Sequence, residues 1–194
     1  MTLSKAQFRE NSLKRLKNVS QHNTLHRTAL LEKKLLRVLQ KHQNKKKLKI
    51  LFYYPLPFEV NLLKVLKKMR LSCEIYIPFM QGESFKMVPF RLPLKKKKFG
   101  IFEAGNTHRK INKIDIAIVP TIGVDGNLQR VGFGKGMYDR FFHKLTKRPY
   151  TIFIQPELCH TKELVCDVHD IYCDLLLTPK KFMTKKARIK TRGN

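Results

Sequence analysis

Apolar residues recur along the chain with two periods, one typical of strands and one typical of helices. Short apolar runs predict strands at residues 49–54, 73–78, 114–119, 151–155 and 174–178. Leucines at helical spacing predict a helix near the N-terminus, at Leu30, Leu31, Leu35, Leu36 and Leu39. Ser4 is placed to cap an earlier helix, and further helical patterns cover residues 58–69 and begin again near Met137. The alternation predicts a three-layer α/β fold: a mainly parallel sheet flanked by helices, with helices at the N-terminus.

A glycine-rich loop joins the strand at 114–119 to the helix that begins near Met137. Gly132, Gly134 and Gly136 occupy alternate positions, so consecutive backbone N–H groups can turn toward one point beside the positive end of the helix. Arg130 and Lys135 add cationic side chains. The pattern predicts a phosphate-binding loop at the carboxyl end of a strand, where open α/β sheets bind their ligands.

The loop fits neither the Walker nor the dinucleotide-binding pattern. From residue 119 to 140 it instead resembles the 5-formyltetrahydrofolate cyclo-ligase family, whose members carry R-L-G-x-G-K-G-Y-Y-D-R. Further pieces follow in the family's order: Lys5 to Arg9, Glu59 after ILFYYP, Gly100 to Glu103, and His169-Asp170 with Asp174 and Thr178. This chain departs from the family's pattern at Ala104, Thr121, Leu128 and Met137.

The resemblance implies ATP- and Mg²⁺-dependent cyclisation of 5-formyltetrahydrofolate to 5,10-methenyltetrahydrofolate, with release of ADP and phosphate. It implies Arg130 and Lys135 as catalytic groups, and an ATP site formed by Lys5, Arg9, Arg130, Gly132, Gly134, Lys135, Gly136 and Tyr138. The implied folate site comprises Tyr54, Glu59, Phe133, Gly134, Lys135, Gly136 and Met137. Magnesium is expected on Asp139, with Asp174 as a second carboxylate from the adjacent strand.

Several of these residues also have a purely structural interpretation. Lys5 and Arg9 are four apart, so they share a helix face that could clamp a triphosphate or simply face solvent. Asp139 falls in the first turn of a helix, where any acid is stabilised by the dipole. Glu59 could be an acidic residue in the N-cap region of a helix. Asp115 and Asp125 are interpreted as structural.

Composition limits the remaining choices. A chain of 194 residues indicates one domain, with a basic C-terminal tail from about residue 180. No apolar run is long enough to span a bilayer, and we expect a cytoplasmic monomer with no membrane partner. The four cysteines, Cys73, Cys159, Cys166 and Cys173, are expected to be reduced thiols. The alternatives are disulfides, or a zinc site formed by Cys159, Cys166, His169 and Cys173.

The net charge of +27 leaves a second class of function open. Much of it lies in lysine runs that are typical of solvated loops, and aromatic residues are not interleaved with them as in single-strand binding surfaces. We therefore expect no specific nucleic-acid partner, only weak binding at low salt. A basic binding module that has lost turnover and a different phosphate-using enzyme on a similar sheet remain the alternatives.

Overall fold

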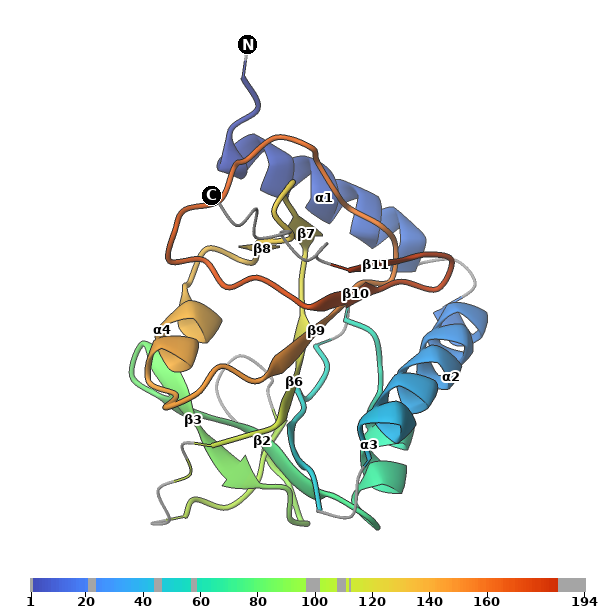
Figure 1. Ribbon diagram of the computed structural model, residues 1–194, viewed down its shortest axis with the longest axis vertical. Coiled ribbons are helices and arrows are strands. Elements are labelled where there is room, and N and C mark those ends of the chain that lie inside the picture. The colour runs from blue at the N-terminus through green and yellow to red at the C-terminus, as the bar shows by residue number, and fades with distance from the viewer. Residues whose placement is uncertain are drawn as a thin grey trace, which may run out of the picture.

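The protein is built on a seven-stranded sheet in the order β11-β10-β9-β6-β1-β2-β3 (Figure 1). The computed structural model describes residues 2–20, 24–43, 47–56, 59–96, 102–107, 111 and 113–184. The sheet strands are β1 (Lys49–Leu51), β2 (Glu74–Gln81), β3 (Ser84–Pro89), β6 (Ile116–Pro120), β9 (Tyr150–Ile154), β10 (Leu175–Leu177) and β11 (Phe182–Thr184). The helices are α1 (Lys5–Ser20), α2 (Thr24–His42), α3 (Leu63–Met69) and α4 (Met137–His143). Shorter strands form two-stranded sheets: β4 (Lys95–Lys96) with β5 (Phe102–Glu103), and β7 (Gly123–Val124) with β8 (Arg130–Val131).

The five inner strands are parallel, and the two edge strands are antiparallel to their neighbours. The five strands predicted from the sequence are these inner strands, so the mainly parallel α/β prediction is confirmed. The edge strands β3 and β11 are additions to it. Strand β11 lies within the predicted basic tail, so residues 182–184 belong to the sheet, whereas residues 185–194 lie outside the described part of the chain.

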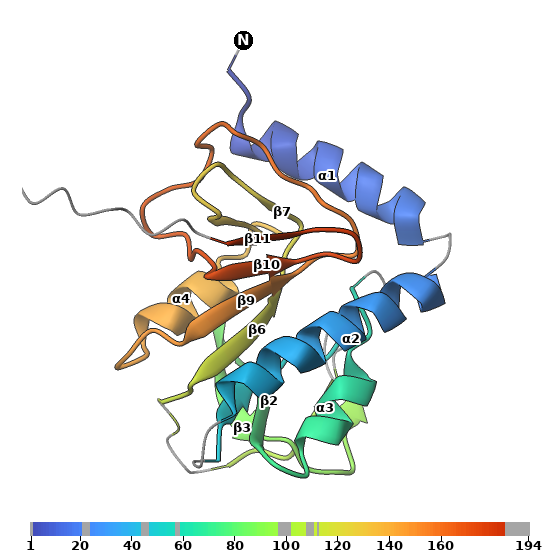
Figure 2. The ribbon, with the colours of Figure 1, turned by 45° about the vertical axis from the view of Figure 1, so that its right-hand side comes forward.

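Alternate residues of the inner strands supply two separate cores, one on each face of the sheet. Ile50, Ile116 and Ile152 pack with the apolar faces of α2 and α3, including Leu35 and Leu66. The intervening residues face α4 and the β2–β3 hairpin, as Leu51, Ala117, Phe153 and Leu176 do. Figure 2 shows α2 and α3 on one side of the sheet and α4 on the other. This period of two is what a strand buried on both faces requires.

Helix α1 lies apart from the two layers and covers the β7–β8 hairpin (Figure 2). A reciprocal cap fixes its first turn: Ser4 Oγ accepts from Gln7 N at 3.2 Å, and Gln7 Oε1 accepts from Ser4 N at 2.9 Å. Phe8 packs so closely on Gly123 that a Cβ there would lie 2.6 Å from its ring. The cap and this contact place the Lys5–Arg9 face of α1 beside the glycine loop.

None of the described helices is long and apolar enough to span a membrane. The predicted helix at 58–69 is shorter in the structure, where α3 begins at Leu63 and residues 57–58 are outside the described ranges. Residues 100–101 of the Gly100–Glu103 motif are outside them as well. All four cysteines are free thiols, as expected.

Candidate active site

A cleft of about 800 Å³ opens at the carboxyl ends of β1, β2 and β6. One wall follows β1 and carries Glu59, a second is the β2–β3 hairpin with Met80 and Phe85, and the third is the glycine loop with the start of α4. Predicted site residues that line it are Tyr54, Glu59, Arg130, Phe133, Lys135, Gly136, Met137 and Tyr138. A volume of this size fits a drug-sized ligand, and its lining is mainly apolar with a few charged groups.

The β7–β8 hairpin places the glycine loop beside this cleft. Asp125, fully buried, accepts hydrogen bonds from Asn127 N and Gln129 N at 2.9 Å each, and its other oxygen accepts from Cys166 N at 3.3 Å. Leu128 adopts a φ of +57°, a left-handed conformation that glycine takes without strain. The leucine found where the family usually has glycine therefore keeps the turn at the expense of backbone strain, and its side chain is buried in the core.

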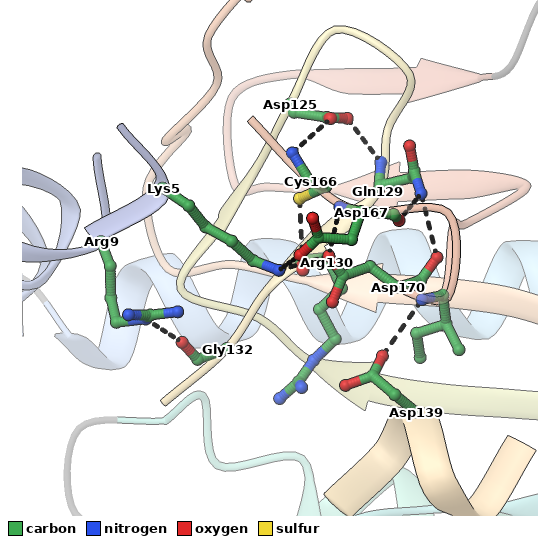
Figure 3. Close-up of polar contacts among 11 residues, drawn as sticks. Lys5, Arg9, Asp125, Gln129, Arg130, Gly132, Asp139, Cys166, Asp167 and Asp170 are labelled. Carbon is green, nitrogen blue, oxygen red and sulfur yellow. Dashed lines mark hydrogen bonds and ion pairs between the residues drawn. The ribbon is translucent and has the colours of Figure 1, made fainter. Parts of the chain in front are cut away.

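The glycine loop has the conformation expected of a phosphate nest. Gly134 and Gly136 have φ values of +88° and +56°, and α4 begins at Met137 immediately after them. Arg9 reaches the loop from α1: its Nε donates to Gly132 O at 2.7 Å, and its guanidinium carbon would lie 3.7 Å from a Cβ on Gly134 (Figure 3). The left-handed glycines and a guanidinium group thus lie together, an arrangement suited to an anion.

Arg130 lies at the base of the cleft. It is 9% exposed, its Nε donates to Pro120 O at 3.1 Å, and its guanidinium carbon lies 4.7 Å from the Tyr138 ring centroid. Burial lowers its pKa, although an arginine remains charged at neutral pH. In the described part of the chain no carboxylate forms an ion pair with it. A buried cation is costly without an anion, so this position is suited to an anionic ligand.

Glu59 lies on the opposite wall from the loop, and its Oε2 accepts from Leu56 N at 2.9 Å. Burial raises the pKa of this carboxyl group to about 7, while the Leu56 hydrogen bond and the charge of Arg130 act in the opposite direction. The side chain can therefore change its protonation near neutral pH. It lines the cleft, where a carboxyl group can accept or, when protonated, donate a hydrogen bond.

Replacing Glu59 with glutamine should make stability less sensitive to pH. The pKa of Glu59 is raised from 4.5 to about 7, so between these two pH values the native wild type binds a proton that the unfolded chain has lost. The free energy of unfolding of the wild type therefore falls as the pH rises from 4.5 to about 7. Relative to wild type, Glu59→Gln should gain stability across this window, by at most about 3 kcal/mol above pH 7. Urea denaturation at pH 5, 6, 7 and 8 measures the difference. A difference that is the same at every pH would contradict the raised pKa.

Lys5 points from α1 to an acidic loop and is partly buried there. Its Nζ contacts Asp170 and lies 3.1 Å from Asp167 Oδ2 (Figure 3). Gln129 holds the same loop, because its Nε2 donates to Asp167 O at 2.7 Å and to Asp170 O at 3.1 Å. Lys5 and Arg9 both leave the same face of α1, as their spacing predicts. Lys5 reaches the acidic loop, and Arg9 reaches the neighbouring glycine loop.

The two carboxylates expected to share magnesium are not brought together. Asp139 lies at the start of α4, where its Oδ1 accepts from Ile171 N at 3.1 Å. Asp174 directly precedes β10, so it lies at the amino ends of the parallel strands, away from the cleft. It accepts from Thr151 N at 2.7 Å and pairs with Arg148 at 3.0 Å.

Asp170 is linked to Asp139 through the main chain, because Ile171, whose N–H donates to Asp139, directly follows Asp170 (Figure 3). Asp170 is 8% exposed and also contributes to a cluster with Asp167 and His169 whose ligand atoms lie within 4.8 Å of one another. The chemistry of Asp139 with Asp170 suits a hard cation that is shared with phosphate oxygens. Among the described residues no such cluster contains a cysteine, so the zinc alternative finds no support.

Sequence reasoning missed three contributors to this region. Asp170 belongs to the closing His-Asp pair, but the sequence pattern assigns it no role. Gln129 belongs to no motif. Arg140 ends the family's signature and lines the cleft, yet its partners come from 57 and 5 residues away and no sequence pattern specifies them.

A buried arginine, a glycine-rich loop and a mainly apolar cleft meet at the carboxyl ends of a mainly parallel sheet in this α/β protein. The 5-formyltetrahydrofolate cyclo-ligase family model matches residues 1–179. The chain belongs to this family, and the family prediction from the sequence is confirmed.

Named relatives agree with this assignment. The chain is 27% identical over 144 residues to a probable 5-formyltetrahydrofolate cyclo-ligase of Schizosaccharomyces pombe, covering 59% of this chain and 71% of that one. It is 33% identical over 66 residues to the 5-formyltetrahydrofolate cyclo-ligase of Mycoplasma pneumoniae, covering 34% and 40%. The fold is similar to the Aquifex aeolicus 5,10-methenyltetrahydrofolate synthetase, with a TM-score of 0.77, 24% identity and coverage of 98% and 97%.

Proposed function

We propose that the protein catalyses the ATP-dependent closure of 5-formyltetrahydrofolate to 5,10-methenyltetrahydrofolate, with ADP and phosphate as the other products. Family membership supports the reaction class. The observation that carries the proposal is Arg130, a buried cation placed where the glycine loop meets an apolar cleft. The apolar walls suit the folate ring, and the nest suits the nucleotide phosphates.

The reaction needs a better leaving group than an amide oxygen. In the proposed sequence the formyl oxygen attacks the γ-phosphorus and ADP leaves. N10 then attacks the activated formyl carbon and loses its proton, the carbon–oxygen bond breaks, and phosphate departs with the former formyl oxygen. Arg130 and Lys135 would stabilise the charge on the transferred phosphoryl group, and Arg9 would hold the nucleotide at the loop. Glu59 and the wall around Met137 would orient the pterin. No side-chain nucleophile takes part.

Magnesium would neutralise phosphate charge when it is bound with the nucleotide. Asp139 and Asp170 are the carboxylates that fit this role, since Asp174 is engaged at the other edge of the sheet. Lys5 already contacts Asp170, so the cation and the lysine would share one carboxylate. We propose this pair in place of Asp139 with Asp174, the pair expected from the sequence.

Absorbance of the methenyl product tests the reaction. Purified protein mixed with 5-formyltetrahydrofolate, ATP and Mg²⁺ should accumulate that product, and omission of ATP should stop it. A binding module that has lost turnover would yield none. A different phosphate-using enzyme would hydrolyse or transfer from ATP without the folate. Absence of product with the complete mixture would reject the proposal.

Substitution of Gly134 should separate nucleotide binding from folate binding. A valine at a φ of +88° is strained, and its Cβ would approach the guanidinium of Arg9. Gly134→Val should weaken ATP binding by about tenfold or more and folate binding by less, from the loss of about 1–3 kcal/mol. Calorimetry with each ligand measures both affinities.

Gly82→Val is the matched control for that experiment. Gly82 also has a positive φ, +59°, with nothing within 4 Å of a built Cβ, and it lies in the hairpin that forms the other wall of the cleft. The control should weaken folate binding more than ATP binding. An equal loss of both ligands in the two variants would contradict the division of the cleft into two halves.

A further inference from the structure

Arg140 joins two walls of the cleft through main-chain carbonyl groups. Its Nε donates to Glu83 O at 3.0 Å, and its Nη2 donates both to Glu83 O and to Lys135 O. Glu83 lies in the turn between β2 and β3, whereas Lys135 belongs to the glycine loop. One guanidinium group therefore spans the hairpin turn and the nest.

The glycine loop leaves room for this arrangement. A Cβ on Gly136 would lie 2.9 Å from Arg140 Nη1, so a larger residue would displace the guanidinium group. Gly136 thus has a second function besides opening the nest, since it lets Arg140 lie against the loop. Gly132 stands in the same relation to the guanidinium of Arg130.

The hairpin also contacts α4 through Ser84 and Phe85, the two residues of β3 that directly follow the turn. Phe85 stacks on Phe141 with ring centroids 4.3 Å apart, and Ser84 Oγ donates to Met137 O at 3.3 Å. These contacts fix β3 on the helix. Glu83 in the turn itself is held by the hydrogen bonds that Arg140 donates to its carbonyl oxygen.

We propose that Arg140 is a positioning residue that fastens the β2–β3 turn to the glycine loop and so couples the folate half of the cleft to the nucleotide half. The coupling rests on the proposed function, while the fastening itself does not. A nucleotide that orders the loop would, through Arg140, set the hairpin wall against which the folate packs. Thermodynamic linkage requires the folate to strengthen nucleotide binding by the same factor.

The planar guanidinium group explains why this position requires arginine. It presents several donors in a fixed fork and can serve two carbonyl groups at once, whereas a lysine ammonium is a compact group on a flexible stem. Arg140→Lys should therefore restore less of the coupling than its retained charge would suggest. Arg140→Gln keeps a neutral donor and should behave like Arg140→Ala.

Binding of 5-formyltetrahydrofolate, measured by calorimetry with and without a non-hydrolysable ATP analogue and Mg²⁺, tests the coupling. In the wild type the analogue should tighten folate binding by roughly fivefold or more. In Arg140→Ala this factor should fall to about one, while affinity for the analogue alone changes by less than about threefold. In steady-state assays the variant should raise KM for the folate more than it lowers kcat.

Arg148→Ala is the matched control. Arg148 also donates to a main-chain carbonyl, Tyr172 O, at 2.9 Å and is exposed, but it lies at the opposite edge of the sheet. The control should retain the wild-type coupling factor. Loss of coupling in both variants, or full coupling in Arg140→Ala, would overturn the proposal, as would a wild type that shows no coupling.

Hydrogen exchange distinguishes failure of the fastening from failure of the proposed function. In the protein without ligands, Arg140→Ala should speed amide exchange at residues 81–84 and 133–137 together, and Arg148→Ala should not. A wild type that binds the analogue but not the folate would reject the proposed function and the coupling. The exchange data would then still test whether Arg140 fastens the β2–β3 turn to the glycine loop. Unchanged exchange in both segments would reject the fastening as well.

Discussion

Replacement of Arg130 by methionine should reduce turnover by about a thousandfold without destabilising the protein. The reason for the loss is that a guanidinium group directed at a transferred phosphoryl group contributes about this much or more. The reason for the retained stability is that Arg130 is a buried cation without an ion-pair partner among the described residues, so an apolar side chain of similar length removes a desolvation cost. The lost hydrogen bond to Pro120 O offsets about 1 kcal/mol of that gain.

Single-turnover rates and thermal denaturation together measure this prediction. The midpoint of unfolding should stay unchanged or rise, and Arg130→Lys should recover part of the rate because it restores the charge but not the planar fork. Arg148→Met is a control for loss of one positive charge and should leave the rate unchanged. An Arg130→Met protein that unfolds several degrees lower, or one that keeps its rate, would show that Arg130 has a structural role instead.

The central sheet was predictable because burial on both faces leaves a simple sequence pattern. Every residue of β6, from Ile116 to Pro120, is buried, and such short apolar runs separated by helical patterns favour parallel strands. The edge strands do not follow that rule. Strand β3 pairs through a tight turn at Gly82, and β11 is a three-residue strand, FMT, whose side chains are mostly exposed. Tertiary pairing, and not local pattern, determines both.

The candidate site shows the same division between local and long-range information. The glycine loop and Arg130 could be predicted, since strand, loop and helix are consecutive in the chain. The second carboxylate of the proposed magnesium site could not be chosen from residue type alone, because Asp170 and Asp174 are four residues apart in one segment. Strand direction distinguishes the two residues. Asp174 directly precedes β10 and so lies at the amino ends of the parallel strands, whereas Asp170 is followed by Ile171, whose N–H donates to Asp139 in α4.

Asparagine substitutions of the three aspartates should therefore divide into two classes. Asp139→Asn and Asp170→Asn should each lower turnover by about a hundredfold or more and raise the Mg²⁺ concentration needed for half-maximal rate, because charge neutralisation at the phosphates is the main electrostatic contribution available there. Asp174→Asn should keep a near wild-type rate. Its cost should be about 1 kcal/mol of stability from the weakened, partly exposed pair with Arg148.

Paramagnetic Mn²⁺ in place of Mg²⁺ gives a measurement that does not depend on turnover. With ATP present, the wild type and Asp174→Asn should bind Mn²⁺ with similar affinity in titrations followed by electron paramagnetic resonance, and the other two variants should bind it more weakly. Circular dichroism at the assay temperature confirms that each variant is folded.

Because Asp170 also contacts Lys5, Lys5→Met is the control for loss of that ion pair alone. Lys5→Met should weaken nucleotide binding and leave the ATP-free affinity for Mn²⁺ no lower than in the wild type. Weak Mn²⁺ binding by Asp174→Asn, with full binding by Asp170→Asn, would return the metal to the pair expected from the sequence.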